Sequence, residues 1–421
     1  MKTDVDQSDS RPWLLMPGGL KFMKPAIEEA HRLGLRVATL DYLPDNPAHR
    51  YSDAYFNADV TDFDAVLDVA RSLPAAGIMA FAVDPAVVTA AKVADVLGLP
   101  FAGTTEAVEI LQNKHRFRRF LRENGFPVPA SIAVDMNVAP DLPETQTLTD
   151  GLRFPLIVKP ADSAGSKGVS LAADRTDFAE ALKNAVRYSR SGVAVAEEYI
   201  AAAGYPSDCE MFLRDGKVEF LSFSQQWFDA KAANPFVPAA FTWPDTLGAG
   251  IRAEAERQLS RLAGLLGLRT GIFNVEMRVG GDGRLYLMEV SPRGGGNRLA
   301  EMMERLCGAP LIRAAVQAAA GMEPDPLPIP EIEGYHALIV LHARKEGVFE
   351  SLHVDAEVER YVREVDLNVK PGDVVSPFSG ANAMAGTVIM EFPNRHEMER
   401  ITRGITDYGK YIKLKIKDNE Q

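Results

Sequence analysis

The stretch of sequence that decides the fold is Gly271-Ile-Phe-Asn-Val-Glu-Met-Arg-Val-Gly-Gly-Asp-Gly-Arg-Leu-Tyr-Leu-Met-Glu-Val-Ser291. Each half is rich in apolar residues with polar residues at intervals, and the run Gly280-Gly-Asp-Gly283 separates the halves. This pattern predicts two antiparallel strands joined by a tight turn. We therefore expect a β-hairpin whose two strands carry the acids Glu276 and Glu289.

The length of the hairpin loop decides where these acids lie. With a loop of two or four residues, Glu276 lies opposite Leu287, and Glu289 lies opposite Asn274. The acids, Asn274 and Arg278 then share one face, because strand residues two apart point the same way. A loop of three or five residues would place the two acids on opposite faces.

A shared face would bring two carboxylates within reach of one ion, since diagonal neighbours lie roughly 7–8 Å apart at Cα. Mg²⁺ takes one or two carboxylates together with the oxygens of a substrate phosphate. The hairpin therefore predicts a metal site at Glu276 and Glu289. The alternatives are edge strands with solvated acids, or neutralisation of the acids by Arg278 alone.

A second motif is Pro155-Leu-Ile-Val-Lys-Pro-Ala-Asp-Ser-Ala-Gly-Ser-Lys-Gly-Val169, in which an apolar strand leads to Lys159 and then to a loop of small residues. Small residues let backbone N–H groups approach an anion, and a lysine acts as a point charge on phosphate. The P-loop spacing G-x-x-x-x-G-K-[ST] is not matched. The motif favours a phosphate-binding loop, against the alternative of a glycine-rich turn beside a surface lysine.

Two further segments have the composition of ligand-binding segments. Val193-Ala-Val-Ala-Glu-Glu-Tyr-Ile200 runs from an apolar strand into paired acids, which suits a hinge that offers backbone groups to an adenine edge, or a solvated turn. Ser291-Pro-Arg-Gly-Gly-Gly-Asn297 precedes a predicted helix. Arg293 there could grip a phosphoryl group or a carboxylate, and the glycines allow close backbone approach. A flexible loop before a helix is the alternative.

The rest of the chain predicts three parts. Strands at 13–16, 35–40 and 77–83 alternate with helices, the last from Pro85 to Leu97, as in a parallel doubly wound sheet. Pro17-Gly-Gly19 lacks the G-x-G-x-x-G spacing, so this domain is expected to bind no dinucleotide. A basic amphipathic helix is predicted over 105–122 and a loop over 137–151. The proline-rich segment 324–330 marks a boundary before a β-rich region that closes with a helix from about Arg395.

Composition limits the function. The 421 residues carry 46 Lys and Arg against 58 Asp and Glu, a net charge of −12, which disfavours nucleic-acid binding. Two cysteines cannot form a disulfide framework. The chain opens without the apolar region of a signal peptide, and its longest apolar run, 75–83, is far below the roughly 20 residues of a membrane span. We expect a cytoplasmic protein that binds neither nucleic acid nor membranes.

The ordered set of a lysine, a lysine with a glycine-rich loop, an acidic hinge, two acids and an arginine resembles the ATP-grasp superfamily from Lys114 to Asn297. Residues 12–103 resemble the domain that precedes it. The resemblance implies an α/β chain, α+β overall, with a Rossmann-like domain over 1–104, an ATP-grasp domain over 105–325 and a β-rich domain over 326–421. Within the second, 105–125 would be a helical linker and about 126–200 a mobile small subdomain.

The resemblance also implies roles for individual residues. ATP would be bound by Lys114, Lys159, Ser166, Gly168, Glu197, Glu198, Tyr199, Ile200 and either Asp208 or Glu210, the last two as candidates for the ribose acid. Mg²⁺, or Mn²⁺ in its place, would be bound by Glu276 and Glu289. Many family members carry an Asn as a further metal ligand where this chain has Ser291, a weaker ligand. Arg293 would be the catalytic residue that steadies phosphoryl transfer, and Arg293 and Asn297 would contact the substrate.

Within the superfamily, the C-terminal region and the segment 291–297 look most like the L-amino-acid ligases. These join a carboxylate to an amine through an acyl phosphate and release ADP. We therefore expect a carboxylate–amine ligase acting on an amino acid or a similar small acid. A bicarbonate-phosphorylating carboxylase, or a nucleotide-binding protein without turnover, are the alternatives. A homodimer is compatible with the resemblance.

Overall fold

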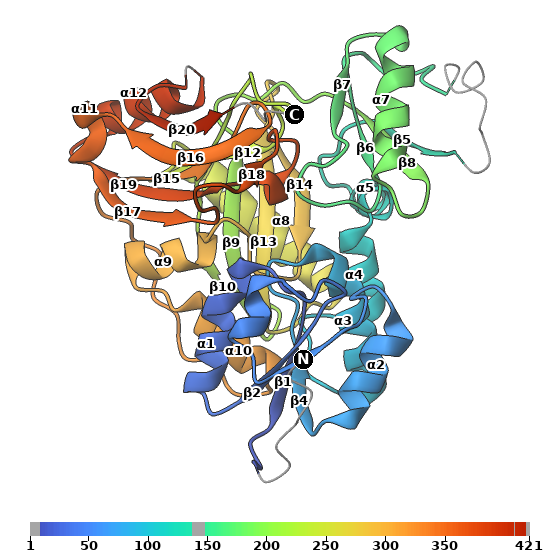
Figure 1. Cartoon of the computed structure of the whole chain (residues 1–421). Helices are drawn as coiled ribbons and strands as arrows, with labels where there is room; N and C mark the ends of the chain where they lie inside the picture. Colours follow the sequence, from blue (N-terminus) through green and yellow to red (C-terminus); the bar gives the residue numbers. More distant parts are fainter. Residues whose placement is uncertain (1–8, 137–147, 408, 418–421) are drawn as a thin grey trace.

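The N-terminal part is a parallel sheet, as the sequence predicts. Its strand order is β3-β2-β1-β4, and every pair of neighbouring strands is parallel. The strands are β1 (Trp13–Pro17), β2 (Arg36–Leu40), β3 (Ala54–Phe56) and β4 (Ala75–Ile78), and the helices are α1 (Lys24–Arg32), α2 (Phe63–Ser72) and α3 (Asp84–Leu97). Figure 1 shows this blue part at the opposite end of the molecule from the C-terminal strands.

The structure is a computed structural model that describes residues 9–136, 148–407 and 409–417. Two sequence predictions fall largely or wholly outside these residues. The reading of the first residues as lacking a signal peptide concerns mainly residues 1–8, and most of the predicted loop 137–151 is residues 137–147.

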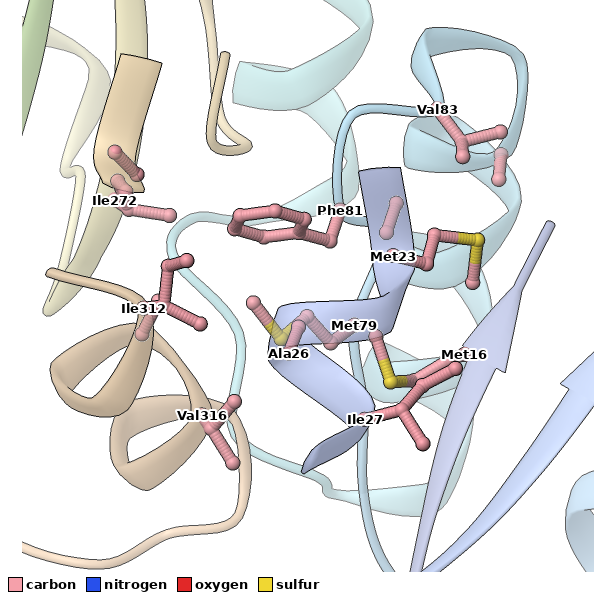
Figure 2. Packing of buried hydrophobic residues seen from close by; sticks show 14 of the residues in the cluster. Met16, Met23, Ala26, Ile27, Met79, Phe81, Val83, Ile272, Ile312 and Val316 are labelled. Carbon is pink, nitrogen blue, oxygen red and sulfur yellow. The ribbon is translucent and has the colours of Figure 1, made fainter. Parts of the chain in front are cut away.

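The predicted strand 77–83 is wrong in extent. Strand β4 ends at Ile78, and residues 79–83 leave the sheet while staying largely buried. Figure 2 shows Phe81 in one apolar cluster with Ile272 and Ile312, which lie on β13 (Gly271–Val279) and α10 (Leu311–Ala319). The apolar run is therefore explained by packing as well as by the strand, and this packing joins the N-terminal sheet to the central part of the chain.

The predicted single helix 105–122 is two helices. α4 (Thr105–Gln112) ends before Asn113, and α5 (Lys114–Glu123) begins after it. Asn113 has extended backbone angles, and its side chain accepts a hydrogen bond from the N–H of Arg116. Asn is a favoured N-cap because its side-chain oxygen satisfies a free N–H of the first turn. The break places Lys114 at the start of a helix, where its N–H donates to the carbonyl of Ala161 (3.0 Å).

Two antiparallel sheets follow. The small sheet has the order β5-β8-β6-β7 and packs against α7 (Arg175–Arg187). Its strands are β5 (Ser131–Asp135), β6 (Leu156–Pro160), β7 (Ser170–Ala172) and β8 (Val193–Glu198). The central sheet has the order β10-β9-β13-β14 and packs against α8 (Ala249–Leu266). Its other strands are β9 (Ser207–Arg214), β10 (Lys217–Leu221) and β14 (Leu285–Ser291). In Figure 1 the small sheet projects at the upper right.

The C-terminal region is β-rich, as predicted. A five-stranded sheet has the order β11-β12-β15-β19-β17, and a three-stranded sheet has the order β18-β16-β20. These strands are β11 (Gln225–Phe228), β12 (Pro238–Trp243), β15 (Tyr335–Leu341), β16 (Gly347–Val354), β17 (Val362–Leu367), β18 (Val374–Val375), β19 (Gly386–Phe392) and β20 (Ile412–Lys417). The helices that complete the described chain are α9 (Leu299–Cys307), α11 (Ala356–Glu359) and α12 (Arg395–Thr406). Residues 320–334 form no helix or strand, but β11 and β12 precede the predicted boundary at 325 and pair with strands that follow it.

Candidate active site

The two acids of the hairpin lie directly opposite each other. Glu276 on β13 pairs with Glu289 on β14, so the predicted register, which placed Glu276 opposite Leu287, is wrong. Five residues separate the paired Val279 and Leu285, and this loop alone would have put the acids on opposite faces. A bulge that leaves Met288 unpaired shifts the register by one residue and returns both acids to the same face.

An arginine from helix α5 forms a hydrogen bond with the bulged residue. The Nη2 group of Arg118 on α5 donates to the carbonyl oxygen of Met288 (2.8 Å). A bulged residue lacks a partner in the strand ladder, so its carbonyl needs a donor from elsewhere. Arg118 therefore helps to hold the geometry that brings the two acids together.

The acids form part of a row across three strands. Asp208 on β9 pairs with Glu276, and Glu276 pairs with Glu289. Burial, and then repulsion from Glu289, raise the pKa of Glu276 to about 7. Burial and the charge of Glu276 likewise raise the pKa of Asp208 well above its ordinary value. Adjacent carboxylates that resist ionisation are poised to take a cation, which would remove the repulsion.

The described residues contain no group of three or more His, Cys, Asp or Glu side chains arranged to hold a metal ion by themselves. Two carboxylates from Glu276 and Glu289 fit Mg²⁺ only if further oxygens come from the ligand. That is the usual mode for Mg²⁺, which keeps waters and takes substrate phosphates in addition to one or two acids.

The two lysines predicted to bind ATP form ion pairs with different acids. Nζ of Lys114 is 3.4 Å from Oε2 of Glu289 and donates to the carbonyl of Ser163 (2.9 Å). Lys114 thus links the acid pair to the glycine-rich loop. Nζ of Lys159, at the end of β6, donates to Oε2 of Glu197 (2.8 Å).

Glu197 is the centre of a buried charge cluster. Its Oε1 lies 2.8 Å from Nε of Arg118, and the side chains of Glu197 and Arg118 are only 2% and 1% exposed. Burial would raise the pKa of Glu197, but Arg118 and Lys159 outweigh it and lower the pKa to about 2. The carboxylate of Glu197 therefore orients Arg118 and Lys159 in this structure, and any contact of this residue with adenine would come from its backbone.

This cluster gives a stability prediction. We expect Arg118→Met to lower the free energy of unfolding by about 3 kcal/mol, because removing one partner leaves Glu197 buried with less compensation and frees the Met288 carbonyl. Urea denaturation measures the change. The matched control is Arg119→Met, since Arg119 is the next residue on α5 but has a 59% exposed side chain. Equal stability of the two variants would contradict this role of Arg118.

The glycine-rich loop is anchored at both of its predicted ligand residues. Ser166 has a left-handed backbone (φ +58°), its hydroxyl donates to the carbonyl of Phe236 (2.9 Å), and its carbonyl accepts from Nδ2 of Asn234 (2.6 Å). Gly168 (φ +72°) packs so closely on Tyr188 and Pro160 that a Cβ there would lie 2.9–3.0 Å from them. The loop therefore lies against the segment between β11 and β12.

The other predicted hinge residues lie at the end of β8. Glu198 pairs with Arg153 at the surface (2.8 Å). Arg278 lies over the ring of Tyr199 (5.5 Å to the centroid), and its Nη1 donates to the carbonyl of Ile200 (2.9 Å). Arg278 therefore holds the hinge instead of neutralising the two acids.

A second row lies beside the acid row. It consists of Glu210 on β9, Asn274 on β13 and Ser291 on β14. Nδ2 of Asn274 donates to Asp208 (2.6 Å) and to Glu210 (3.1 Å). Asp208 and Glu210, predicted as alternatives for the ribose acid, thus share one donor and lie beside the acid pair.

Arg293 is held by an acid that the sequence did not single out. Nε and Nη2 of Arg293 donate to the two oxygens of Asp84 (2.9 and 2.8 Å), the first residue of α3. Ser291 donates to Asp84 (2.8 Å) and accepts from Nε2 of Gln112 (2.6 Å). The signal for Asp84 was its position after a buried strand at the carboxyl edge of a parallel sheet, where such sheets carry their sites.

Asn297 has a left-handed backbone (φ +53°), as does Arg298, which precedes α9. The triple glycine before it is needed for packing at two positions. A Cβ on Gly294 would lie 2.5 Å from the ring of Phe81, and one on Gly295 would lie 2.3 Å from Oε1 of Glu210. The segment after β14 therefore runs close to both the N-terminal part and the second row.

Two protein-family models match this sequence. A family model of the ATP-grasp domain matches residues 152–301, and a model of L-amino acid ligase C-terminal domain 2 matches residues 339–405. The chain therefore contains an ATP-grasp domain and an L-amino acid ligase C-terminal domain. This confirms the family and the α+β fold predicted from the ordered motifs.

Solved structures with the same fold cover nearly all of this chain. An L-amino acid ligase from Bacillus licheniformis covers 97% of it, over 99% of that structure, with a TM-score of 0.76 and 22% identity. A phosphoribosylglycinamide synthetase from Anaerococcus prevotii covers 97%, over all of that structure, with a TM-score of 0.72 and 17% identity. One biotin carboxylase domain of this fold, from Hydrogenobacter thermophilus, was solved in complex with MgADP.

The curated relatives match only part of the chain. A D-alanine–D-alanine ligase from Sodalis glossinidius is 29% identical over 206 residues, which are 47% of this chain and 54% of that protein. A carbamoyl phosphate synthase large chain from Ralstonia nicotianae is 24% identical over 60% of this chain. The chain spans about a fifth of the length of such synthase chains. Among its described residues, no helix has the length and apolar character needed to cross a bilayer.

Proposed function

We propose that the protein is an ADP-forming carboxylate–amine ligase that activates an amino acid or a similar small acid as an acyl phosphate. The observation that carries this proposal is that Glu276 and Glu289 lie directly opposite each other, with Lys114 beside Glu289. Arg293, four residues after Glu289 in the chain, is held in place by Asp84. These residues together suit a triphosphate, a divalent cation and a carboxylate in one place. The family models and the fold of an L-amino acid ligase support it.

In this proposal the chain supplies positioning and charge. When bound at Glu276 and Glu289, Mg²⁺ would offset the negative charge of the ATP phosphates. Lys114 and Lys159 bind phosphate oxygens, and the loop 163–169 covers them. Residues 197–200 hold the adenine through their backbone. The planar guanidinium of Arg293 faces the transferring phosphoryl group or the substrate carboxylate. The two carboxylate oxygens of Asp84 keep this guanidinium oriented.

We also propose the domain boundaries given above, at 104/105 and 325/326. The two family matches fall within the second and third of these domains. The packing of β11 and β12 on the C-terminal strands means that the third domain completes its sheet with residues of the second.

The experiment that tests the function uses ATP, Mg²⁺ and an equimolar mixture of the common L-amino acids. We expect phosphate and ADP to be released only when the mixture is present, together with a condensed product detected by mass spectrometry. ATP binding without release of phosphate under any of these conditions would contradict the proposal and favour a nucleotide-binding protein.

A bicarbonate-phosphorylating enzyme is the second candidate, because carbamoyl phosphate synthase large chains and a biotin carboxylase domain are among the similar proteins. The same assay with bicarbonate in place of the amino acids separates the two. Phosphate release that depends on bicarbonate, and not on the amino-acid mixture, would select this candidate.

A further inference from the structure

One carboxylate oxygen beside the acid pair has no hydrogen-bond partner among the described residues. Glu210 is 2% exposed, and its Oε1 accepts hydrogen bonds from the N–H of Gly295 (2.9 Å) and from Nδ2 of Asn274 (3.1 Å). Its other oxygen, Oε2, is buried and makes no hydrogen bond to any residue that the structure describes. A buried acceptor without a donor is costly, so a fold that keeps one usually supplies the donor from a ligand.

The backbone around Glu210 is shaped to accommodate this carboxylate. A Cβ on Gly295 would lie 2.3 Å from Oε1 of Glu210 and 2.8 Å from Nδ2 of Asn274, so only glycine permits the approach. A Cβ on the next residue, Gly296, would meet no atom within 4 Å. The segment after β14 is therefore tight at Gly295, beside the carboxylate, and open at Gly296.

The charge of the site selects the ligand. Burial raises the pKa of Glu210 to about 8, although the charge of Arg293 and the hydrogen bonds from Gly295 and Asn274 oppose the rise. A second anion would add repulsion to Asp208 and Glu276 in the neighbouring row. Asn274 directs its donor Nδ2 at Asp208 and at Glu210, so these two acids are bridged by an amide and not by an ion. A cation with N–H donors fits the remaining oxygen.

We propose that Oε2 of Glu210 binds the ammonium group of a substrate. The inference rests on the proposed function and names one of its binding groups. Glu210 pairs with Asn274, two residues along β13 from Glu276, a distance of about 7 Å along the strand. An ammonium on Glu210 therefore lies next to the metal-binding acids and to Arg293, where the carboxylate reacts.

Two sources supply a primary ammonium in such a reaction. One is the α-ammonium of the amino acid whose carboxylate is phosphorylated, and the other is the amine that attacks the acyl phosphate. In the second case, the bound ammonium loses one proton to become the nucleophilic amine. Its nitrogen then forms the amide bond and loses a second proton, and the C–O bond to phosphate breaks with release of inorganic phosphate. The shared chemistry is an N–H donor on a positive nitrogen, and the test separates the sources.

The test is Glu210→Gln, which keeps the shape and the acceptor for Gly295 and Asn274 but removes the charge. The first assay forms hydroxamates from the common L-amino acids, with ATP, Mg²⁺ and excess hydroxylamine, which is uncharged at neutral pH. The second measures dipeptides from the same amino acids. The matched control is Glu256→Gln on the exposed side of α8.

We expect Glu210→Gln to raise one KM by about 10- to 100-fold, because the variant loses a hydrogen bond between two charged groups. A raised KM for the amino acid in the hydroxamate assay assigns Glu210 to the α-ammonium of the activated acid. A normal KM there with a raised amine KM in dipeptide formation assigns it to the attacking amine. If Glu210→Gln does not fold, Glu210→Asp replaces it, and the same KM values decide.

Unchanged KM values in both assays would overturn the inference. Unchanged KM values with a higher Mg²⁺ requirement would also overturn it and would assign the oxygen to a metal ion. Absence of hydroxamate from the wild-type protein is a different failure, because it contradicts the proposed ligase itself.

Discussion

Glu289→Gln is expected to lower ATP turnover by about 10³-fold, or ~4 kcal/mol of transition-state stabilisation. The amide keeps the size of the side chain but removes half of the charge that the strand pair offers to a cation. It also removes the partner of Lys114, whose Nζ lies 3.4 Å from Oε2 of Glu289. ADP release in the presence of Mg²⁺ and the amino-acid mixture measures the effect.

The fold of this variant should survive, and its melting temperature should not fall. Glu276 and Glu289 repel each other without a cation, so neutralising one relieves that repulsion. Glu256→Gln serves as the control for the exchange itself. Turnover near that of the wild type in Glu289→Gln would contradict the metal assignment, whereas a loss of turnover with a lost thermal transition would show only unfolding.

The two strands of the hairpin were predictable from the sequence, but their register was not. The glycine run and the apolar segments on both sides of it predicted two antiparallel strands, but they placed both acids on one face only for a loop of two or four residues. The exact register was not predictable, because a five-residue loop needs the compensating bulge at Met288. That bulge is matched by Arg118, a residue 170 positions away in the chain. No local pattern contains such a contact.

The helix break at Asn113 was missed for a different reason. Charges and apolar residues continue through 105–122 with helical spacing, so periodicity predicts one helix. The capping preference of Asn is a local signal, but the link of Lys114 to the carbonyl of Ala161 is a tertiary contact. The residue type indicated a cap, and only the packing decides that the chain turns there.

The sequence identified the charged residues of the site, but it did not identify the residues that contact them in the fold. Lys159, Glu276, Glu289 and Arg293 stand in motifs of a few residues, so their grouping is visible in the sequence. The partner of Arg293 comes from the N-terminal part, 209 positions away. The unpartnered oxygen of Glu210 depends on the burial of β9 between β10 and β13, which a single strand pattern does not contain.

Arg293→Lys is expected to lower kcat by about 10²- to 10³-fold, the usual effect of removing one donor aimed at developing charge. Lysine keeps the positive charge but loses the planar fork, so it cannot bind Asp84 with two donors and also face a second anion. The KM for ATP should change little, because Lys114 and Lys159 remain. Steady-state kinetics with the amino-acid mixture separates kcat from KM.

Asp84→Asn tests whether Asp84 acts through Arg293. The amide can accept one hydrogen bond from the guanidinium but cannot match both donors with a charge, so we expect a smaller loss of kcat, about 10-fold. Because the two side chains form one unit, the double variant Asp84→Asn with Arg293→Lys should be no slower than Arg293→Lys alone. Losses that multiply would show that Asp84 has a role independent of Arg293, and wild-type kcat in Arg293→Lys would remove Arg293 from the phosphoryl-transfer step.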